Sequence, residues 1–373
     1  MKIVIGSVLK PLDDVRHYHK LGLSLAKISN ANLFIAARAT PYQADSKREN
    51  ICFHAISPVQ PRFIQRLLAP FKFGVYLLKV KPAIIIACTH ELLIVIILYR
   101  IIFGAKILYD VQENYALNLQ ENKRFPSWLT QLLSYWIRAK ERLCTSLVSQ
   151  FWLAETCYLE EMPFMRPKAT VFENKSLFFG PPKDLFPASL PLIRLLFSGT
   201  IAKENGIFEA VQLAVGLHAI DARYQLHIIG CCHNASVEKE IRLVVSPYSE
   251  FIHLKISSIP FGYEAIQETI AASHIGLVPY RPQRNFRDKI PTKLYEYTAA
   301  SLGIVLQDNS IWTQFCAPFQ NALSIDFQQI DAMKIHTGIQ NLRLMPATNS
   351  DQSLFWVSEE EKLREAVQAL NIQ

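Results

Sequence analysis

A lysine and a glutamate near the predicted start of a helix are the residues best placed for chemistry. They lie in the stretch from Asp288 to Glu296, which contains Pro291, Thr292 and Lys293. A Pro-Thr pair is typical of a helix start, where unpaired backbone N–H groups and the helix dipole attract phosphate. Lys293 would add a positive charge, and Glu296 could accept hydrogen bonds from ribose hydroxyls. The alternative is an ordinary capped helix with an exposed Lys293–Glu296 pair, worth only ~0.2–0.5 kcal/mol.

The residues before this helix predict the elements that position it. Ile275 to Tyr280 is an apolar run typical of a buried strand. A loop with four basic residues, Arg281, Arg284, Arg287 and Lys289, then leads into the helix. Strand, basic loop and helix start in this order are typical of a phosphate site at the edge of a parallel sheet.

Composition limits the classes of protein. The chain has 373 residues, 50% of them hydrophobic and 19% charged, which indicates globular domains, two by length. The net charge of +7 suits a nucleotide diphosphate, an anionic membrane or nucleic acid. Because the bases are scattered and match no nucleic-acid motif, we expect no nucleic-acid partner.

Cysteine usage and hydropathy indicate a cytoplasmic protein. The seven cysteines form no CxxC pair and no zinc spacing, which is typical of reduced thiols. The apolar run at the N-terminus is too short for a signal peptide. The longest apolar run, from Leu92 to Tyr99, is far below the ~20 residues of a membrane-spanning helix.

The first half alternates between apolar β-rich runs and helical patterns, which predicts parallel βαβ units. The run at Leu147–Leu153 is expected to close the sheet. The other expected strands are Lys2–Gly6, Asn32–Ala37, Ile51–Ile56, Ala83–Cys88 and Lys106–Val111.

Ligands of such sheets bind beyond the carboxyl ends of the strands, so the residues that follow each strand are candidates. Asp14 and Arg16 could orient a substrate, or could serve as a helix cap and a surface charge. His90 could be functional or a satisfied structural histidine. The candidates on this side are Gly6, Asp14, Arg16, His90, Glu91, Asp110 and Glu113.

The second half repeats the strand–glycine–helix pattern. Prolines at 181, 182, 187 and 191 mark the best domain boundary. A strand from Ile193 then ends at Gly199 and Thr200, with Lys203 as the nearest base, and another strand ends at Gly230. Such a turn could cradle phosphate, or could be a strand–helix turn without a ligand.

The run from Pro291 to Tyr297 resembles the donor signature of family 4 glycosyltransferases, which have the GT-B fold. In that family two acidic residues flank seven others, and here they are Asp288, where Glu is usual, and Glu296. The resemblance implies an α/β protein with two Rossmann-like, doubly wound parallel-sheet domains facing a cleft. We expect an acceptor-side domain at 1–185, a nucleotide-sugar domain at 186–355, and a helix at 356–373 that crosses back and is held by Trp356.

Besides Asp288, departures of the sequence from the family pattern include Thr200, Asn205 and Gln112. Thr200 and Asn205 stand where relatives carry the Arg and Lys of Gly-Arg-x4-Lys-Gly, and Gln112 replaces a histidine after Asp110. These departures motivate one alternative, a catalytically silent GT-B scaffold that binds a glycan or a partner protein. A nucleotide-sugar epimerase is another.

The resemblance implies a retaining, metal-independent hexosyltransferase of surface polysaccharide synthesis. It would use a UDP- or GDP-linked sugar as co-substrate, a carbohydrate or lipid-linked glycan as acceptor, and no other cofactor. In agreement, no Asp-x-Asp metal pair follows a strand. The implied catalytic residues are Asp288, Lys293 and His90. The implied donor-binding residues are Gly199, Thr200, Lys203, Gly230, Tyr280, Thr292, Lys293, Leu294 and Glu296.

Two segments combine bases with aromatic residues at helical spacing. Residues 61–79 favour a helix at a membrane interface, whereas 126–143 favour a core-facing helix with a solvated basic side. The expected location is therefore the cytoplasm or, peripherally, the inner face of the membrane. At the C-terminus, Ser358 and Glu361 predict a capping box.

Overall fold

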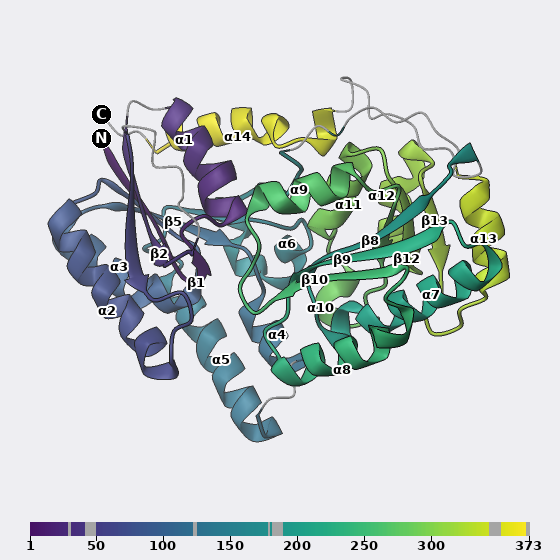
Figure 1. Ribbon diagram of the computed structural model, residues 1–373. Coiled ribbons are helices and arrows are strands. Elements are labelled where there is room, and N and C mark those ends of the chain that lie inside the picture. The colour runs from purple at the N-terminus through teal and green to yellow at the C-terminus, as the bar shows by residue number, and fades with distance from the viewer. Residues whose placement is uncertain are drawn as a thin grey trace. The chain divides into compact units, whose positions relative to one another are not determined.

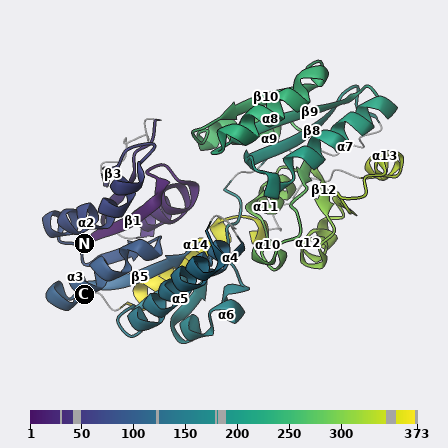
Figure 2. The same ribbon diagram turned by 90° about the horizontal axis from the view of Figure 1, so that it is seen from below.

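The computed structural model contains two compact units, each with its own parallel sheet between helices (Figures 1 and 2). Unit 1 comprises Met1–Asn174 and Trp356–Gln373, and unit 2 comprises Lys175–Phe355. The prolines at 181, 182 and 187 lie outside the described residues. The structure describes residues 1–28, 31–41, 50–121, 125–177, 180, 189–342 and 352–370.

The sheet of unit 1 has seven strands in the order β3-β2-β1-β4-β5-β6-β7, all parallel. The direction of winding reverses between β1 and β4, which is the point where open parallel sheets bind ligands. The strands are β1 (Lys2–Pro11), β2 (Asn32–Arg38), β3 (Ile51–Ser57), β4 (Ile84–Ala87), β5 (Lys106–Val111), β6 (Gln150–Leu153) and β7 (Ala169–Val171).

Two expectations about this sheet were wrong. The strand at 147–153 is shorter, Gln150–Leu153, and it does not close the sheet, because β7 pairs beyond it. β7 has only three residues, all half-buried, so it carries no apolar run that the sequence could reveal. β1 also continues to Pro11 instead of ending at Gly6.

Helices cover both faces of the unit 1 sheet. Core side chains of α2, α3 and the end of α5 pack on the face formed by Val4, Ala36, Ile85 and Ile107. In Figure 1, α1 and α14 run along the upper edge of the unit, whereas α2, α3 and α5 lie below. The helical segments are η1 (Val15–Gly22), α1 (Leu23–Ile28), α2 (Phe63–Val80), η2 (His90–Leu92), α3 (Leu93–Phe103), α4 (Tyr115–Glu121), α5 (Ser127–Cys144), α6 (Tyr158–Glu161), η3 (Pro163–Lys168) and α14 (Val357–Gln368).

The sheet of unit 2 has the order β10-β9-β8-β11-β12-β13 and is also fully parallel. Its winding reverses between β8 and β11. The strands are β8 (Ile193–Thr200), β9 (Tyr224–Cys231), β10 (Ile252–Ser257), β11 (Ile275–Val278), β12 (Gly303–Gln307) and β13 (Ala322–Ile325). The helical segments are η5 (Lys203–Asn205), α7 (Ile207–Ile220), α8 (Ala235–Val245), η6 (Ser246–Tyr248), α9 (Tyr263–Ala271), α10 (Arg284–Arg287), α11 (Thr292–Ala299), α12 (Ser310–Cys316), η7 (Ala317–Phe319), α13 (Ala332–Gln340) and η8 (Gln352–Leu354).

The C-terminal helix α14 packs beside α1 (Figure 1). Trp356 is fully buried, and its indole N–H donates to Ser24 Oγ at 2.9 Å. The expected capping box at Ser358 was wrong, because the helix begins at Val357 and places Ser358 inside its first turn.

Two glycines bring backbone segments of unit 2 into close approach at the carboxyl ends of β8, β9 and β11. A Cβ on Gly206, which has φ +75°, would lie 1.8 Å from the carbonyl oxygen of Pro279. A Cβ on Gly230 would lie 1.8 Å from the carbonyl oxygen of Gly199. Glycine is therefore required at both positions.

We predict that Gly206→Ala lowers the free energy of unfolding by more than about 3 kcal/mol, because the new methyl group meets rigid backbone. Gly104→Ala is the matched control, since Gly104 has φ +74° and open space around it. It should cost only the ~1–2 kcal/mol of a left-handed non-glycine residue. Urea unfolding followed by circular dichroism measures both, and equal losses would contradict the close-approach argument.

Candidate functional site

Lys293 lies at the carboxyl edge of the unit 2 sheet, near the point where the winding reverses. It is in the first turn of α11, and its Cε is 3.2 Å from the position that a Cβ on Gly199 would occupy. Gly199 in turn pairs with Gly230 across β8 and β9. The structure therefore brings Gly199, Gly230 and Lys293 together, although Gly199 and Lys293 are 94 residues apart in the sequence.

The ammonium group of Lys293 is buried and has no hydrogen-bond partner among the residues described. The residue is 7% exposed. Its Nζ lies 4.8 Å from the ring centre of Phe197 and 5.0 Å from that of Tyr280. Such cation–π contacts contribute ~0.5–2 kcal/mol, less than the cost of removing an ammonium group from water. An anion bound here would supply the missing partner.

Other basic and polar residues of this turn are already paired. Lys203 Nζ forms a 2.7 Å ion pair with Glu240 and also lies 5.4 Å from the ring centre of Phe208. Asn205 is buried, and its side-chain amide donates to the carbonyl oxygen of Thr200 at 2.7 Å. Asn205 therefore holds the loop shape, and the cation of this edge is Lys293.

A cavity of about 510 Å³ lies between the loop at residues 280–288 and the start of α12, and Lys293 is not among its lining residues. Tyr280 connects this cavity to Lys293, because the residue lines the cavity and its ring also faces Lys293 Nζ. Asp288 lines it too, with its carboxylate held by Arg287 in two hydrogen bonds of 2.9 Å. This volume is within the range of small-molecule sites. The remaining lining residues are Arg281, Pro282, Gln283, Arg284, Phe286, Arg287, Gln307, Asp308, Asn309, Ser310, Ile311 and Trp312.

Glu296 is half-buried on α11, one turn after Lys293. The pKa of the Tyr263 hydroxyl is raised above its usual value, mainly by burial and further by the charge of Glu296, which places that carboxylate nearby. The next residue, Tyr297, is fully buried and shares a 2.8 Å hydrogen bond with Ser198 Oγ of β8. Tyr297 thus fixes the helix against the sheet while Glu296 stays accessible. Thr292 is half-buried at the first position of α11, and Leu294 is fully buried on its inner side.

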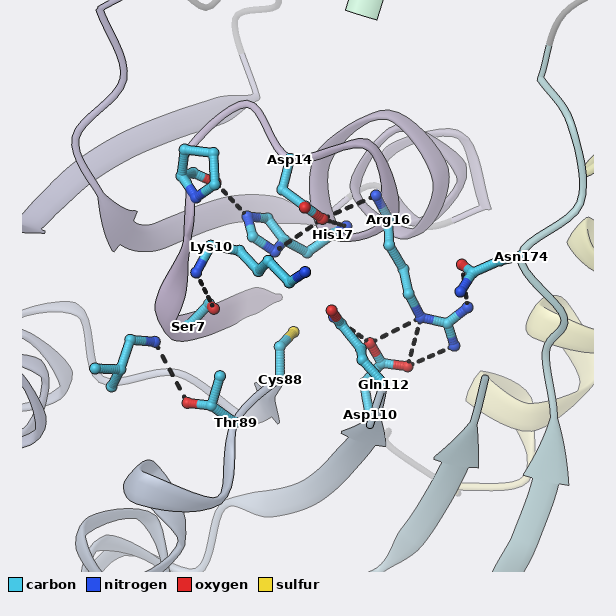
Figure 3. A network of polar contacts seen from close by, with 12 residues as sticks. Ser7, Lys10, Asp14, Arg16, His17, Cys88, Thr89, Asp110, Gln112 and Asn174 are labelled. Atoms are coloured by element: carbon cyan, nitrogen blue, oxygen red, sulfur yellow. Dashed lines mark hydrogen bonds and ion pairs between the residues drawn. The ribbon is translucent and has the colours of Figure 1, made fainter. Parts of the chain in front are cut away.

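At the corresponding edge of unit 1, the charged side chains are paired with one another by hydrogen bonds and ion pairs (Figure 3). Arg16 is only 4% exposed, so the surface-charge alternative was wrong for this residue. Its guanidinium donates to Asp110 at 2.7 and 3.0 Å, to the Phe172 carbonyl at 2.8 Å and to Asn174 Oδ1 at 2.9 Å. Arg16 therefore ties β5 to the last residues of unit 1 before the chain enters unit 2.

The neighbours of this ion pair are mostly structural. Asp14 caps η1 by accepting from the N–H groups of Arg16 and His17. Gln112 donates to Asp110 at 2.8 Å, and the adjacent Cys88 is buried, which raises its pKa well above the usual value (Figure 3).

Gly6 and Glu113 contact other residues of unit 1. The space where a Cβ on Gly6 would lie is filled by the ring of Phe73. Glu113 accepts from Asn118 at 2.9 Å.

His90 begins η2 directly after β4 and shares a 2.7 Å contact between its Nδ1 and Lys140 Nζ. Burial lowers its pKa to about 4, and Lys140 acts in the same direction, whereas Glu91 acts against them. Glu91 also pairs with Arg66 at 3.3 Å. The imidazole is thus neutral at neutral pH, with Nδ1 accepting from Lys140.

The fold is that of the GT-B glycosyltransferases, as the resemblance implied. No family model matches the sequence, and no curated protein matches it. Among solved structures, HepE from Anabaena in complex with UDP and glucose has 13% identity and a TM-score of 0.66, covering 99% of each chain. Sucrose-phosphate synthase from Thermosynechococcus elongatus has 16% identity and a TM-score of 0.62 over 99% of this chain and 94% of that one. The lipopolysaccharide outer core galactosyltransferase WaaB has 14% identity and a TM-score of 0.57 over 99% of each chain.

The described residues contain neither a metal-ligating cluster nor a membrane-spanning helix. No group of three or more His, Cys, Asp or Glu side chains is arranged to hold a metal ion. In the same part of the chain, no helix combines the length and apolar character needed to cross a membrane.

Sequence analysis did not find Trp312 or Asn174. Trp312 lines the cavity, and its indole N–H donates to the Lys289 carbonyl at 2.6 Å. Asn174 receives a hydrogen bond from Arg16 across 158 residues. Trp312 lies in no recognisable motif, and the run around Asn174, which resembles the family's approach to the linker, does not reveal that its partner is Arg16.

We predict that His90 makes the folded protein less stable as the pH falls. In the unfolded chain it takes up a proton near pH 6.5, but in the folded protein only near pH 4. Since the unfolded state binds more protons in this window, the free energy of unfolding should fall as the pH falls from about 6.5 towards 4. Urea unfolding at several pH values should show a shallower decline for His90→Gln than for the wild type. An identical decline would show that His90 is protonated normally in the fold.

Proposed function

We propose that the protein is a glycosyltransferase that moves a sugar from a nucleotide-diphosphate sugar to a carbohydrate acceptor. The observation that carries the proposal is the buried ammonium of Lys293, which lacks a hydrogen-bond partner among the described residues. It lies at the sheet edge where nucleotide ligands bind in open parallel sheets. The comparison structures support the same class, because HepE was solved with UDP and with UDP-glucose.

In this proposal the diphosphate of the donor contacts Lys293, the first turn of α11 and the backbone at Gly199 and Thr200. Glu296 binds the ribose hydroxyls, and Gly230 gives the nucleotide close access to the backbone. Tyr280 and Asp288 face the sugar from the adjoining cavity. Family 4 membership, a UDP-linked donor and independence of metal are part of the proposal.

The demanding step is the departure of the nucleotide diphosphate. The bond between the sugar C1 and the β-phosphate oxygen breaks, and its electron pair remains on that oxygen. The acceptor oxygen bonds to the same face of C1, so that configuration is retained, and its proton passes to the leaving phosphate. Lys293 and the dipole of α11 stabilise the developing charge, and such preorganised electrostatics is often the largest catalytic contribution.

The acceptor side is proposed to be unit 1, with Asp14, Glu91 and Glu113 as carboxylates that follow β1, β4 and β5. The proposed acceptor is a glycan or lipid-linked glycan of surface polysaccharide synthesis, handled at the inner face of the membrane. His90 would contribute as a neutral imidazole. Arg16 and Asp110 satisfy each other, so they would position the loop without touching substrate.

We predict that Lys293→Met weakens UDP binding by ~10–100-fold, because a charge-assisted hydrogen bond worth ~1.5–3 kcal/mol is lost. Without nucleotide, the same change should leave thermal stability unchanged or increase it, since an unpaired buried charge is removed. Turnover should fall by ~10²–10³-fold. Calorimetric titration with UDP, GDP and ADP without metal measures the binding. If the wild type binds none of the three, the catalytically silent scaffold becomes the better hypothesis.

We also predict that Glu296→Ala lowers donor affinity with the fold intact, because the ribose loses a charged acceptor worth ~1.5–3 kcal/mol. Glu264→Ala, on the exposed side of α9, is the matched control and should bind like the wild type. The same titration distinguishes the two variants. Unchanged affinity in the Glu296 variant would remove this residue from the ribose site.

A further inference from the structure

Lys140 lies on the inner side of α5, where the spacing of the helix predicts an apolar residue. The buried residues of α5 recur every three or four positions, and Ile137 and Cys144 flank Lys140 on this side. Lys140 is 7% exposed, and its Nζ lies 2.7 Å from Nδ1 of His90, at the start of η2. A lysine is rarely buried unless it is paired, because removing an ammonium group from water is costly. The contact with His90 is therefore the feature that the position of Lys140 serves.

The hydrogen bond between Lys140 and His90 has one direction while the lysine is charged. An ammonium group has three N–H donors and no acceptor, so Nδ1 of His90 must accept. A neutral imidazole whose Nδ1 accepts carries its hydrogen on Nε2. Burial lowers the pKa of Lys140, but the carboxylates of Glu91 and Glu141 act in the opposite direction and favour the charged ammonium. Lys140 therefore selects one tautomer of His90.

The surroundings of the His90 ring also keep it neutral and hold its orientation. Burial is the main cause that lowers its pKa to about 4. Glu91 acts to raise this pKa, whereas Lys140 and Arg66 act to lower it. The ring of Tyr115 contacts the imidazole edge-on, with ring centres 4.8 Å apart and an interplanar angle of 71°. The charge, the tautomer and the orientation of His90 are thus set by residues that pack around it.

The Nε2–H group of His90 points to a place that one hydroxyl group could fill. Nε2 lies 3.8 Å from Glu91 Oε2, which is longer than a hydrogen bond. That carboxylate oxygen is buried and has no hydrogen-bond partner among the described residues, whereas Oε1 pairs with Arg66 at 3.3 Å. A hydroxyl group can accept from Nε2 and donate to Oε2. Both groups follow β4, beside the point where the winding of the unit 1 sheet reverses, and open sheets bind ligands at such an edge.

We propose that Lys140 is a positioning residue, which holds His90 as the Nε2–H tautomer so that the ring donates a hydrogen bond to a hydroxyl oxygen of the substrate. Lys140 itself contacts no substrate, and His90 acts as a hydrogen-bond donor and not as a general base. The substrate part of this inference rests on the proposed function and deepens it, because it assigns a role to a lysine that no sequence motif indicated.

The tautomer is tested directly by NMR of the full chain labelled with ¹⁵N at histidine. The sequence has ten histidines, so the signals of His90 are assigned by their absence from His90→Gln. At pH 7, long-range ¹H–¹⁵N spectra should show His90 with a bare Nδ1 and a protonated Nε2. A hydrogen on Nδ1, or a charged ring at this pH, would overturn the proposal. The measurement requires neither donor nor acceptor.

The role of Lys140 is tested in the same spectra by Lys140→Met, which removes the ammonium group and keeps a long side chain. The His90 ring should then populate both tautomers, and its pKa should rise above about 4, because a positive neighbour is lost. Lys140→Arg keeps an N–H donor and should keep the wild-type tautomer. The control is Arg142→Met, which changes an exposed base of the same helix and should leave the His90 signals unchanged. An unchanged tautomer in Lys140→Met would remove the positioning role.

The link with the reaction is tested by the release of UDP from UDP-glucose, with water as the acceptor. Lys140→Met should lower kcat by ~3–10-fold, as loss of one hydrogen bond does, with the KM for UDP-glucose unchanged. If Lys140 acts through His90, Lys140→Met combined with His90→Gln should be as slow as His90→Gln alone. Multiplied losses would show independent roles and overturn the proposal. A wild type that binds no nucleotide in calorimetry would overturn the substrate part together with the proposed function, and the NMR spectra would still decide the role of Lys140.

Discussion

The burial of the Lys293 side chain is the constraint on which the site of unit 2 depends. A lysine that is 7% exposed must be compensated, and the described residues provide only the faces of Phe197 and Tyr280. The fold can hold the charge there because α11 is fixed against β8 through Tyr297 and Ser198. The close approach of Gly199 and Gly230 leaves no side chain to cover it. In the proposed function, an anionic ligand compensates this buried charge, and a site formed in advance in this way gains affinity from preorganisation.

The matching edge of unit 1 shows the opposite solution. Arg16 is as deeply buried as Lys293, but Asp110, Asn174 and the Phe172 carbonyl satisfy it. Both sheets reverse their winding at one point. At that point unit 1 has a buried charge whose hydrogen bonds are satisfied, whereas unit 2 has a buried charge without a hydrogen-bond partner among the described residues. This contrast explains why the anion is assigned to unit 2. It also gives Arg16 a role, since the residues it binds include the last ones before the chain enters unit 2.

The sequence predicted the parts of this fold that have a local signature. The apolar runs located β2, β3 and β5 within a residue, and the Pro-Thr pair located the start of α11. β7 was missed because its three half-buried residues show no periodic apolar pattern. The capping box was wrong because the helix begins one residue before Ser358, the residue predicted to cap it. The partners of Arg16 and the cavity beside Asp288 depend on residues far apart in the chain, which no local pattern encodes.

Helix α3 shows why periodicity alone does not predict which side chains are buried. An apolar residue at every third or fourth position predicts that one side of a helix is buried. α3 has apolar residues on nearly every side, although only its inner side packs on the sheet and its outer side is exposed. In water the outer side stabilises nothing, since burial is the source of apolar stabilisation. A chain that only needed a core would be more soluble with polar residues there. α2 and α3 also contain no acidic residue, so their open sides are both apolar and free of negative charge from these helices.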